Sequence, residues 1–502
     1  MDNRNYLLKV LGLSAIPRIV TFALKMISFP LMVRSLGASE YGIIVYIMSV
    51  IAVLESFVDF GVSSAAGKDL AVIRETSTIS LDFMIKRWAK LQFIVAISGL
   101  IPLLLATYFI AMYYSNIKFS LNVMILLVFA TWSTIFINFT RACFNSILAF
   151  RAVAILDVTD SIMRSIGWLW IAYYMPTTFG YAIANLFASV FISLFGVFIL
   201  LFIISKYKKS IRSSEIPENI SVKYMLDESL TFLWLRLITR LFHAVPIIIF
   251  GRLFSSELVG IIGAFSKIVE LFNFPFAVIG NALAVRAPGV VAKGYAASRA
   301  LWDAAARFIS ISIIISISVY IGSEFLAEIL FGNSRQDTVR LISILSATVF
   351  TTIASSIIAP MSDYVGALKS RNYLLTLLTV IQGPIIYLGG VFFDSIGSLA
   401  AYVTILFFMN IGYAIISIKH FFKSSHYVIR FEIIYLNFIV LLSALFIYYI
   451  DTLFKTYGLS NCTNINIVFI EILIFWLIIG LFIISNKNIK KYLFTRNFFE
   501  YS

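Results

Sequence analysis

The sequence predicts an all-α polytopic membrane protein with about fourteen transmembrane helices. Two observations about composition carry this prediction: 61% of the 502 residues are hydrophobic and only 13% are charged, and the mean hydropathy is +0.96. The third observation is that apolar runs of roughly 20 residues, the length that crosses a bilayer as a helix, recur from end to end. A soluble protein of this size would need far more polar surface, and a membrane β-barrel would alternate weakly over segments of about 10 residues.

The apolar runs define the expected spans in chain order. Twelve of them form two sets of six, and two more follow at the C-terminus. The expected spans are 11–33, 41–65, 91–113, 121–141, 152–175, 178–204, 229–252, 257–285, 304–331, 338–364, 373–393, 397–418, 431–450 and 465–485.

The basic residues predict the orientation of these spans. The net charge is +14, and most Lys and Arg fall in segments on one side, such as "KYKKSIR" at 206–212, while the short segments on the other side hold few. Such an asymmetry is the positive-inside signal of a membrane protein. We therefore expect both termini in the cytoplasm and attribute the charge to topology, which excludes a nucleic-acid footprint.

The ends of the chain and its cysteines add two expectations. Arg18 and Lys25 interrupt the first apolar run and no small-residue cleavage site follows, so this run is expected to be an uncleaved anchor. Cys143 and Cys462 fall near opposite faces of the membrane in this topology. Two cysteines so placed cannot form a disulfide, and no disulfide framework is expected.

An internal repeat divides the chain. At an offset of 218, "RIVTFALKMISFPLMVRSLGASEYGII" (18–44) aligns without gaps on "RLITRLFHAVPIIIFGRLFSSELVGII" (236–262), which places Arg18 on Arg236 and Gly42 on Gly260. An offset of six spans preserves orientation, as in transporters built from parallel repeats. We expect a six-helix bundle at 1–212, a second at 213–430, and two further helices with a basic tail at 431–502.

The repeat also places the cations that lie within apolar spans. Arg18 and Lys25 are seven residues apart and share one helical face, and Arg236, Arg240 and His243 occupy the matching face of the seventh span. A cation at the centre of a span costs about 2.5–3.5 kcal/mol by insertion scales, unless it faces a water-filled cavity or a partner. We predict a cation-lined cavity for an anionic substrate, formed by the residues Arg18, Lys25, Arg236, Arg240, His243 and Lys267.

Acidic residues within the spans have two interpretations. Glu55 and Asp59 are four apart in the second span, and the fifth span carries Asp157 and Asp160 followed by Arg164. Asp160–Arg164 and Lys267–Glu270 have the spacing of ion pairs within one helix. The alternative is that Glu55, Asp59, Asp157 or Asp160 exchanges a coupling proton or sodium ion.

Motifs of soluble enzymes are missing from the sequence. It has no phosphate-binding glycine loop, no Cys/His spacing typical of a metal site and no nucleophile elbow, and it contains only three histidines. We therefore expect no catalytic residues, no metal and no cofactor other than a coupling proton or sodium ion.

Two segments resemble a known family. "VRSLGASEYGIIVYIMSVIAVLESFVDFGVSSAAGKDLA" (33–71) is similar to the opening of the O-antigen polysaccharide-lipid flippases, with an "LG-x-x-x-YG" turn and a "D-x-G" segment at the end of the second span. "LFGNSRQDTVRLISILSATVFTTIASSIIAPMSDYVGALKSRN" (330–372) looks like the matching late segment. Flippases of this kind belong to the multidrug/oligosaccharidyl-lipid/polysaccharide exporter superfamily.

The resemblance implies a function in lipopolysaccharide biosynthesis. Such proteins move undecaprenyl-pyrophosphate-linked oligosaccharides across the bacterial inner membrane by alternating access. Membrane lipid surrounds them and is a further expected partner. Polysaccharide polymerase and chain-length proteins are the partners that the resemblance implies. Arg18, Lys25, Arg236 and Arg240 are then candidates for a pyrophosphate clamp, because arginine binds phosphate in a bidentate manner and lysine contributes a point charge.

Three alternatives stay open. A multidrug exporter of the same superfamily would have a cavity dominated by acids. An O-antigen polymerase or ligase would carry a long outer loop, whereas the outer loops expected here are at most about 15 residues. A flippase for a peptidoglycan precursor would share both the fold and the substrate head-group.

Overall fold

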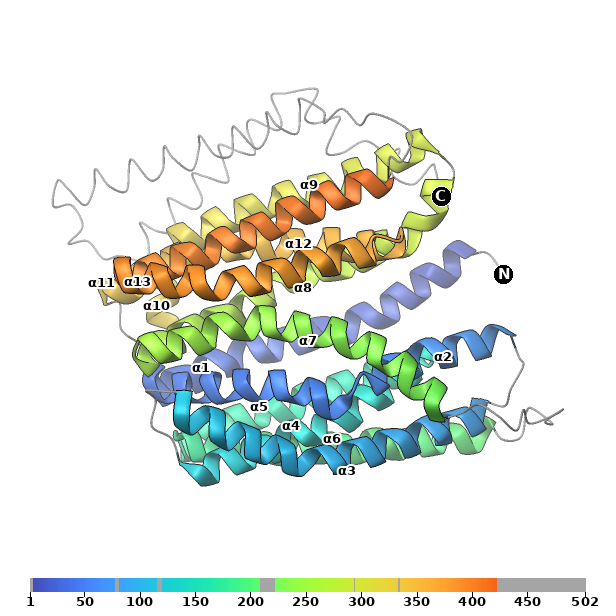
Figure 1. The fold of residues 1–502 in the computed structure, drawn as a ribbon, viewed down its shortest axis with the longest axis horizontal. Helices are drawn as coiled ribbons and strands as arrows, with labels where there is room; N and C mark the ends of the chain where they lie inside the picture. Colours follow the sequence, from blue (N-terminus) through green and yellow to red (C-terminus); the bar gives the residue numbers. More distant parts are fainter. Residues whose placement is uncertain are drawn as a thin grey trace. The chain divides into compact units, whose positions relative to one another are not determined.

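The computed structural model describes residues 3–76, 81–114, 120–207, 222–292, 294–332 and 335–421. Within these residues every regular element is an α-helix, which confirms the predicted fold class. The chain forms two compact units, residues 1–263 and 264–502. Within each unit the long helices run along a common direction (Figure 1).

The first unit holds seven helices and the beginning of an eighth. In chain order they are α1 (Asn3–Asp59), α2 (Val62–Thr76), α3 (Leu81–Tyr114), α4 (Leu121–Ser146), α5 (Phe150–Tyr174), α6 (Thr178–Tyr207), α7 (Val222–Leu253) and the first turns of α8 (Ser256–Ala292). The second unit holds the rest of α8, then α9 (Tyr295–Ile321), α10 (Ser323–Phe331), α11 (Gln336–Leu345), α12 (Ala347–Tyr364) and α13 (Leu368–Phe421).

Two of these helices each contain two predicted spans. α1 is interrupted at Gly37, with φ 77° and ψ 160°, inside the turn predicted between 33 and 41. α13 is interrupted at Phe393 and Asp394, inside the turn predicted between 393 and 397. A positive φ is accessible to glycine at little cost, which explains the glycine in the "LG" turn.

Most of the predicted spans are long and apolar in the structure as well. Nine helical stretches among the described residues are long and apolar enough to cross a membrane. α5 has the expected length but is more polar, since it carries Arg151, Asp157, Asp160 and Arg164. The spans predicted at 431–450 and 465–485 lie outside the described residues.

α4 and α12 each pack against several helices of their own unit. α4 contacts α1, α2, α3, α5 and α6, and α12 contacts α9, α11 and α13. Around α4 the core contains large, fully buried side chains such as Trp88 and Phe144, together with the thiol of Cys143. α4 is the fourth predicted span and α12 belongs to the tenth, with which the repeat aligns it.

α7 belongs by its contacts to the first unit, where it packs against α1 and α2. An ion pair supports this packing, since Lys68 Nζ of α2 lies 2.8 Å from Glu228 Oε2 of α7. This hydrogen bond raises the pKa of Lys68. The division at 212/213 follows the repeat and stays a prediction.

Candidate functional site

Two predicted cations and two predicted acids form one ion-pair cluster between α1 and α7. Arg236 Nη2 lies 3.3 Å from Glu55 Oε1, and Arg236 Nη1 contacts the carboxylate of Asp59. Arg240 Nη1 lies 3.2 Å from Glu55 Oε2. Side chains four residues apart lie on one face of a helix. The two acids of α1 therefore face the two arginines of α7.

The acids of the cluster are more deeply buried than its arginines. The exposed fraction of the side chain is 0% for Asp59 and 3% for Glu55, compared with 17% for Arg236 and 34% for Arg240. Ser63 Oγ also donates a hydrogen bond of 2.6 Å to Asp59 Oδ1. A charge at such a depth requires a partner. The pairing therefore accounts for both acids and both arginines in an apolar bundle.

The end of α1 brings Asp59 to α7. Phe60 and Gly61 follow with φ of 52° and 73° and turn the chain into α2. A Cβ atom at Gly61 would overlap the carbonyl oxygen of Ser229 in α7. The "D-x-G" segment thus combines an acid that pairs with α7 and a glycine that permits a close approach to it.

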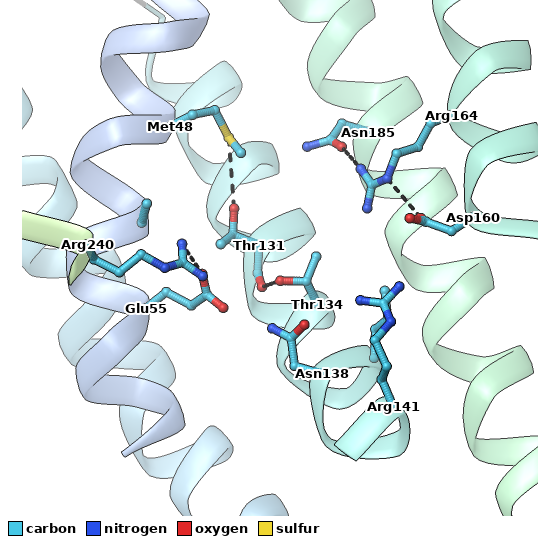
Figure 2. A pocket seen from close by; sticks show the side chains of 12 residues that line it. Met48, Glu55, Thr131, Thr134, Asn138, Arg141, Asp160, Arg164, Asn185 and Arg240 are labelled. Carbon is cyan, nitrogen blue, oxygen red and sulfur yellow. Dashed lines mark hydrogen bonds and ion pairs between the residues drawn. The ribbon is translucent and has the colours of Figure 1, made fainter. Parts of the chain in front are cut away.

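A cavity of about 300 Å³ lies beside this cluster, within the first unit. Figure 2 shows Glu55 and Arg240 on one side, Arg164, Asp160 and Asn185 on the other, and α4 between them. Nine of its twelve lining residues carry polar or charged side chains. The lining residues are Met48, Ala52, Glu55, Thr131, Thr134, Ile137, Asn138, Arg141, Asp160, Arg164, Asn185 and Arg240.

The acids of α5 are also paired. Arg164 Nε lies 2.8 Å from Asp160 Oδ1, as the i, i+4 spacing predicts, and Arg164 Nη1 donates to Asn185 Oδ1 at 2.7 Å. Asp157 pairs with another helix, because its Oδ1 lies 2.8 Å from Arg141 Nη2 of α4. Asp160 therefore lines the cavity, while Asp157 holds one of the arginines that do.

Three other predicted cations lie apart from the lining of this cavity. Lys25 is half-buried in α1. His243 is exposed on α7, edge-on to Phe242 at 5.6 Å between ring centroids. Lys267 is exposed on α8 and pairs with Glu270 at 2.9 Å, as predicted. The side chain of Arg18 lies outside the described residues, and binding by all of these residues stays a prediction.

The sequence prediction missed several lining residues. Arg141, Asn138 and Asn185 were not among its candidates, and Arg164 was considered only as an ion-pair partner. A usable signal existed, because Asn138 and Arg141 follow Thr131 and Thr134 at steps of three to four residues in an apolar span, which gives α4 one polar face.

Comparison with known sequences decides the family. The family model described as "Polysaccharide biosynthesis protein" matches residues 7–284. The chain belongs to the polysaccharide biosynthesis protein family. The match covers more than half of the chain and includes most of α1, all of α7 and every residue that lines the cavity. Among curated proteins no sequence matches the chain significantly.

Solved structures show the fold that this member of the polysaccharide biosynthesis protein family shares. A lipid II flippase, MurJ in an inward closed conformation, matches with a TM-score of 0.66 at 13% identity, over 94% of this chain and 99% of that one. An inward-facing multidrug resistance MATE family transporter of the MOP superfamily matches with a TM-score of 0.58 at 16% identity, over 82% and 100%. A MOP superfamily transporter from Pyrococcus furiosus, described as having a binding pocket of reverse polarity, matches with a TM-score of 0.53 at 16% identity, over 83% and 95%.

Proposed function

We propose that this protein is a flippase for undecaprenyl-pyrophosphate-linked oligosaccharides, such as O-antigen repeat units, in the bacterial inner membrane. It works by alternating access, and both termini lie in the cytoplasm. Membership in the polysaccharide biosynthesis family supports the substrate class. The likeness of its fold to that of a lipid II flippase supports the mode of action.

The observation that carries the proposal is the polar cavity inside a bundle of membrane helices. Three arginines, two asparagines and two threonines line it. Polar groups at this position are costly in a membrane protein and commonly mark a substrate pathway. A glycan that crosses the membrane needs such a surface, because its hydroxyl groups lose water on entry.

The head-group clamp is part of this proposal. Of the two arginines in the cluster, Arg240 is better suited to bind a pyrophosphate, because it is a third exposed and has one carboxylate partner. Arg236 is held by two carboxylates. Lys25 of α1 adds a second cation, and Arg18, His243 and Lys267 complete the proposed set.

Ion coupling is proposed at the paired acids Glu55, Asp59, Asp157 and Asp160. A proton or sodium ion on Glu55 would weaken its attraction for Arg240. The guanidinium group would then be released to the pyrophosphate. Binding of the ion and binding of the anion would in this way be coupled through one carboxylate.

The test is flipping of a lipid-linked oligosaccharide in proteoliposomes, scored by the access of an external modifying enzyme to the sugar. We expect Arg240→Ala and Lys25→Ala to lose movement that the wild type shows under a proton or sodium gradient. Lys86→Ala serves as the matched control, since Lys86 is 59% exposed and pairs with Asp82 within α3. Normal flipping by both the Arg240 and the Lys25 variant would contradict the clamp.

The same assay distinguishes the flippase from a second candidate, a multidrug exporter. The likeness to the MATE transporter is the observation that supports this candidate. An exporter of organic cations requires an excess of acids in its cavity. Here two acids and three arginines line the cavity, so it has no excess of acids, which favours the flippase. Transport of a fluorescent organic cation, without movement of the lipid-linked sugar, would support the exporter instead.

A further inference from the structure

The charges around the cavity are balanced. Ion pairs connect four arginines with four carboxylates: Arg141, Arg164, Arg236 and Arg240 with Asp157, Asp160, Asp59 and Glu55. Glu55 and Asp160 line the cavity beside their partners Arg240 and Arg164, so an anion bound there would also meet two carboxylates. While Glu55 holds Arg240, this balance favours a neutral ligand in the cavity, and the proposed clamp acts only once Arg240 is released.

The lining offers both donors and acceptors of hydrogen bonds. Asn138 and Asn185 each carry an amide that can donate and accept, and the carboxylates of Glu55 and Asp160 accept. Arg141 adds the N–H groups of its guanidinium as donors. Hydroxyl groups, which donate and accept at once, match such a mixed surface.

The size of the cavity limits the ligand. A volume of about 300 Å³ is at the lower end of the roughly 300–1,000 Å³ of small-molecule sites. It suits one sugar ring and excludes a whole oligosaccharide. A smaller hollow shares Arg164 and Asn185 with the cavity and has Trp168 in its wall, which supplies an aromatic face next to it.

We propose that this cavity is a subsite for one neutral, hydroxyl-rich sugar ring of the transported glycan. The ring lies between the wall formed by Glu55 and Arg240 and the wall formed by Asp160, Arg164 and Asn185 (Figure 2). Asn138 and Arg141 of α4 bind it from between these walls. The subsite rests on the proposed flippase function, and it assigns the choice of glycan to the first unit.

The test uses the full chain in lipid nanodiscs and saturation-transfer NMR. The probes are neutral methyl hexopyranosides, including an N-acetylated one, with methyl glucuronoside and inorganic pyrophosphate for comparison. We expect at least one neutral glycoside to bind the wild type and the exposed-site control Lys86→Ala. Binding should be roughly tenfold weaker in Asn138→Leu and Asn185→Leu, because a buried hydrogen bond is lost in each.

A variant that keeps the shape of the site guards against misfolding. If the leucine variants fail to fold, Thr134→Val takes their place. It removes one hydroxyl group from the lining and should also weaken binding of the glycoside. Three results would overturn the subsite: no neutral glycoside binds the wild type, the variants bind as the wild type does, or the glucuronoside binds more tightly than every neutral probe.

The flipping assay keeps the two proposals apart. Glycoside binding that depends on Asn138 and Asn185, in a protein that does not move lipid-linked sugar, would support the subsite and contradict the flippase. Movement of lipid-linked sugar without glycoside binding would overturn the subsite and leave the flippase supported.

Discussion

At the scale of single residues, the ion pair between Asp59 and Arg236 explains why both charges occur inside an apolar bundle. Asp59 is fully buried and Arg236 is 17% exposed, and they lie 177 residues apart in the chain. Glu55 and Ser63 complete the surroundings of this pair. Neither charge would be tolerated in an apolar bundle alone, because each needs the other to offset its desolvation.

We therefore expect Arg236→Ala to destabilise the protein strongly, by about 3–5 kcal/mol, as for other buried pairs that lose one partner. The substitution leaves the carboxylate of Asp59 buried without its guanidinium. The thermal unfolding midpoint in detergent, followed by circular dichroism, measures the effect.

The double variant Asp59→Leu/Arg236→Leu is the control for this prediction. Replacing both partners by apolar side chains leaves no unpaired charge, so much of the lost stability should return. A double variant as unstable as Arg236→Ala, or more so, would show that the unpaired charge is not the cause.

At the scale of elements, two glycines that the repeat aligns bring α1 and α8 together. A Cβ atom at Gly42 would overlap the carbonyl oxygen of Ser256, and one at Gly260 would overlap that of Ala38. Ser39 Oγ and Ser256 Oγ are 2.8 Å apart at the same crossing. Small residues let helices approach closely in membranes.

We expect Gly42→Ala and Gly260→Ala each to destabilise the first unit and lower the yield of folded protein. An added methyl group must push the helix backbones apart, and a backbone carbonyl cannot rotate away as a side chain can. Size-exclusion profiles and unfolding midpoints in detergent would measure this effect.

Gly67→Ala is the matched control for the helix crossing. Gly67 also lies within a helix, but a Cβ atom there would be 3.5 Å from that of Ala142, an ordinary contact. Alanine is favoured over glycine within helices by about 1 kcal/mol. Equal losses in all three variants would contradict the importance of the crossing.

At the scale of the whole molecule, the distribution of basic residues predicts its orientation. We expect an alkaline phosphatase fusion after residue 118 to be active, because this segment is outside in the proposed topology. A fusion after residue 212 should be inactive, and a fluorescent-protein fusion there should be bright. The opposite pattern would reverse the orientation and the direction of transport proposed above.

The structure confirms the sequence prediction best where a pattern is local and periodic. Apolar runs predicted α3, α4 and α6, and the turns at Gly37 and Asp394 fall between spans as expected. The Asp160–Arg164 and Lys267–Glu270 pairs formed as their spacing predicts. In each case a single helix fixes the geometry.

The sequence by itself determined the helical membrane fold, the repeat and the residues that share one helical face, because these follow from hydropathy and from 3.6 residues per turn. Only the tertiary structure decided that Arg236 meets Asp59, that Arg141 meets Asp157, and that Asn138 and Asn185 line one cavity. Spacing along a helix fixes the direction in which a side chain points about the helix axis. The packing of neighbouring helices determines what the side chain meets.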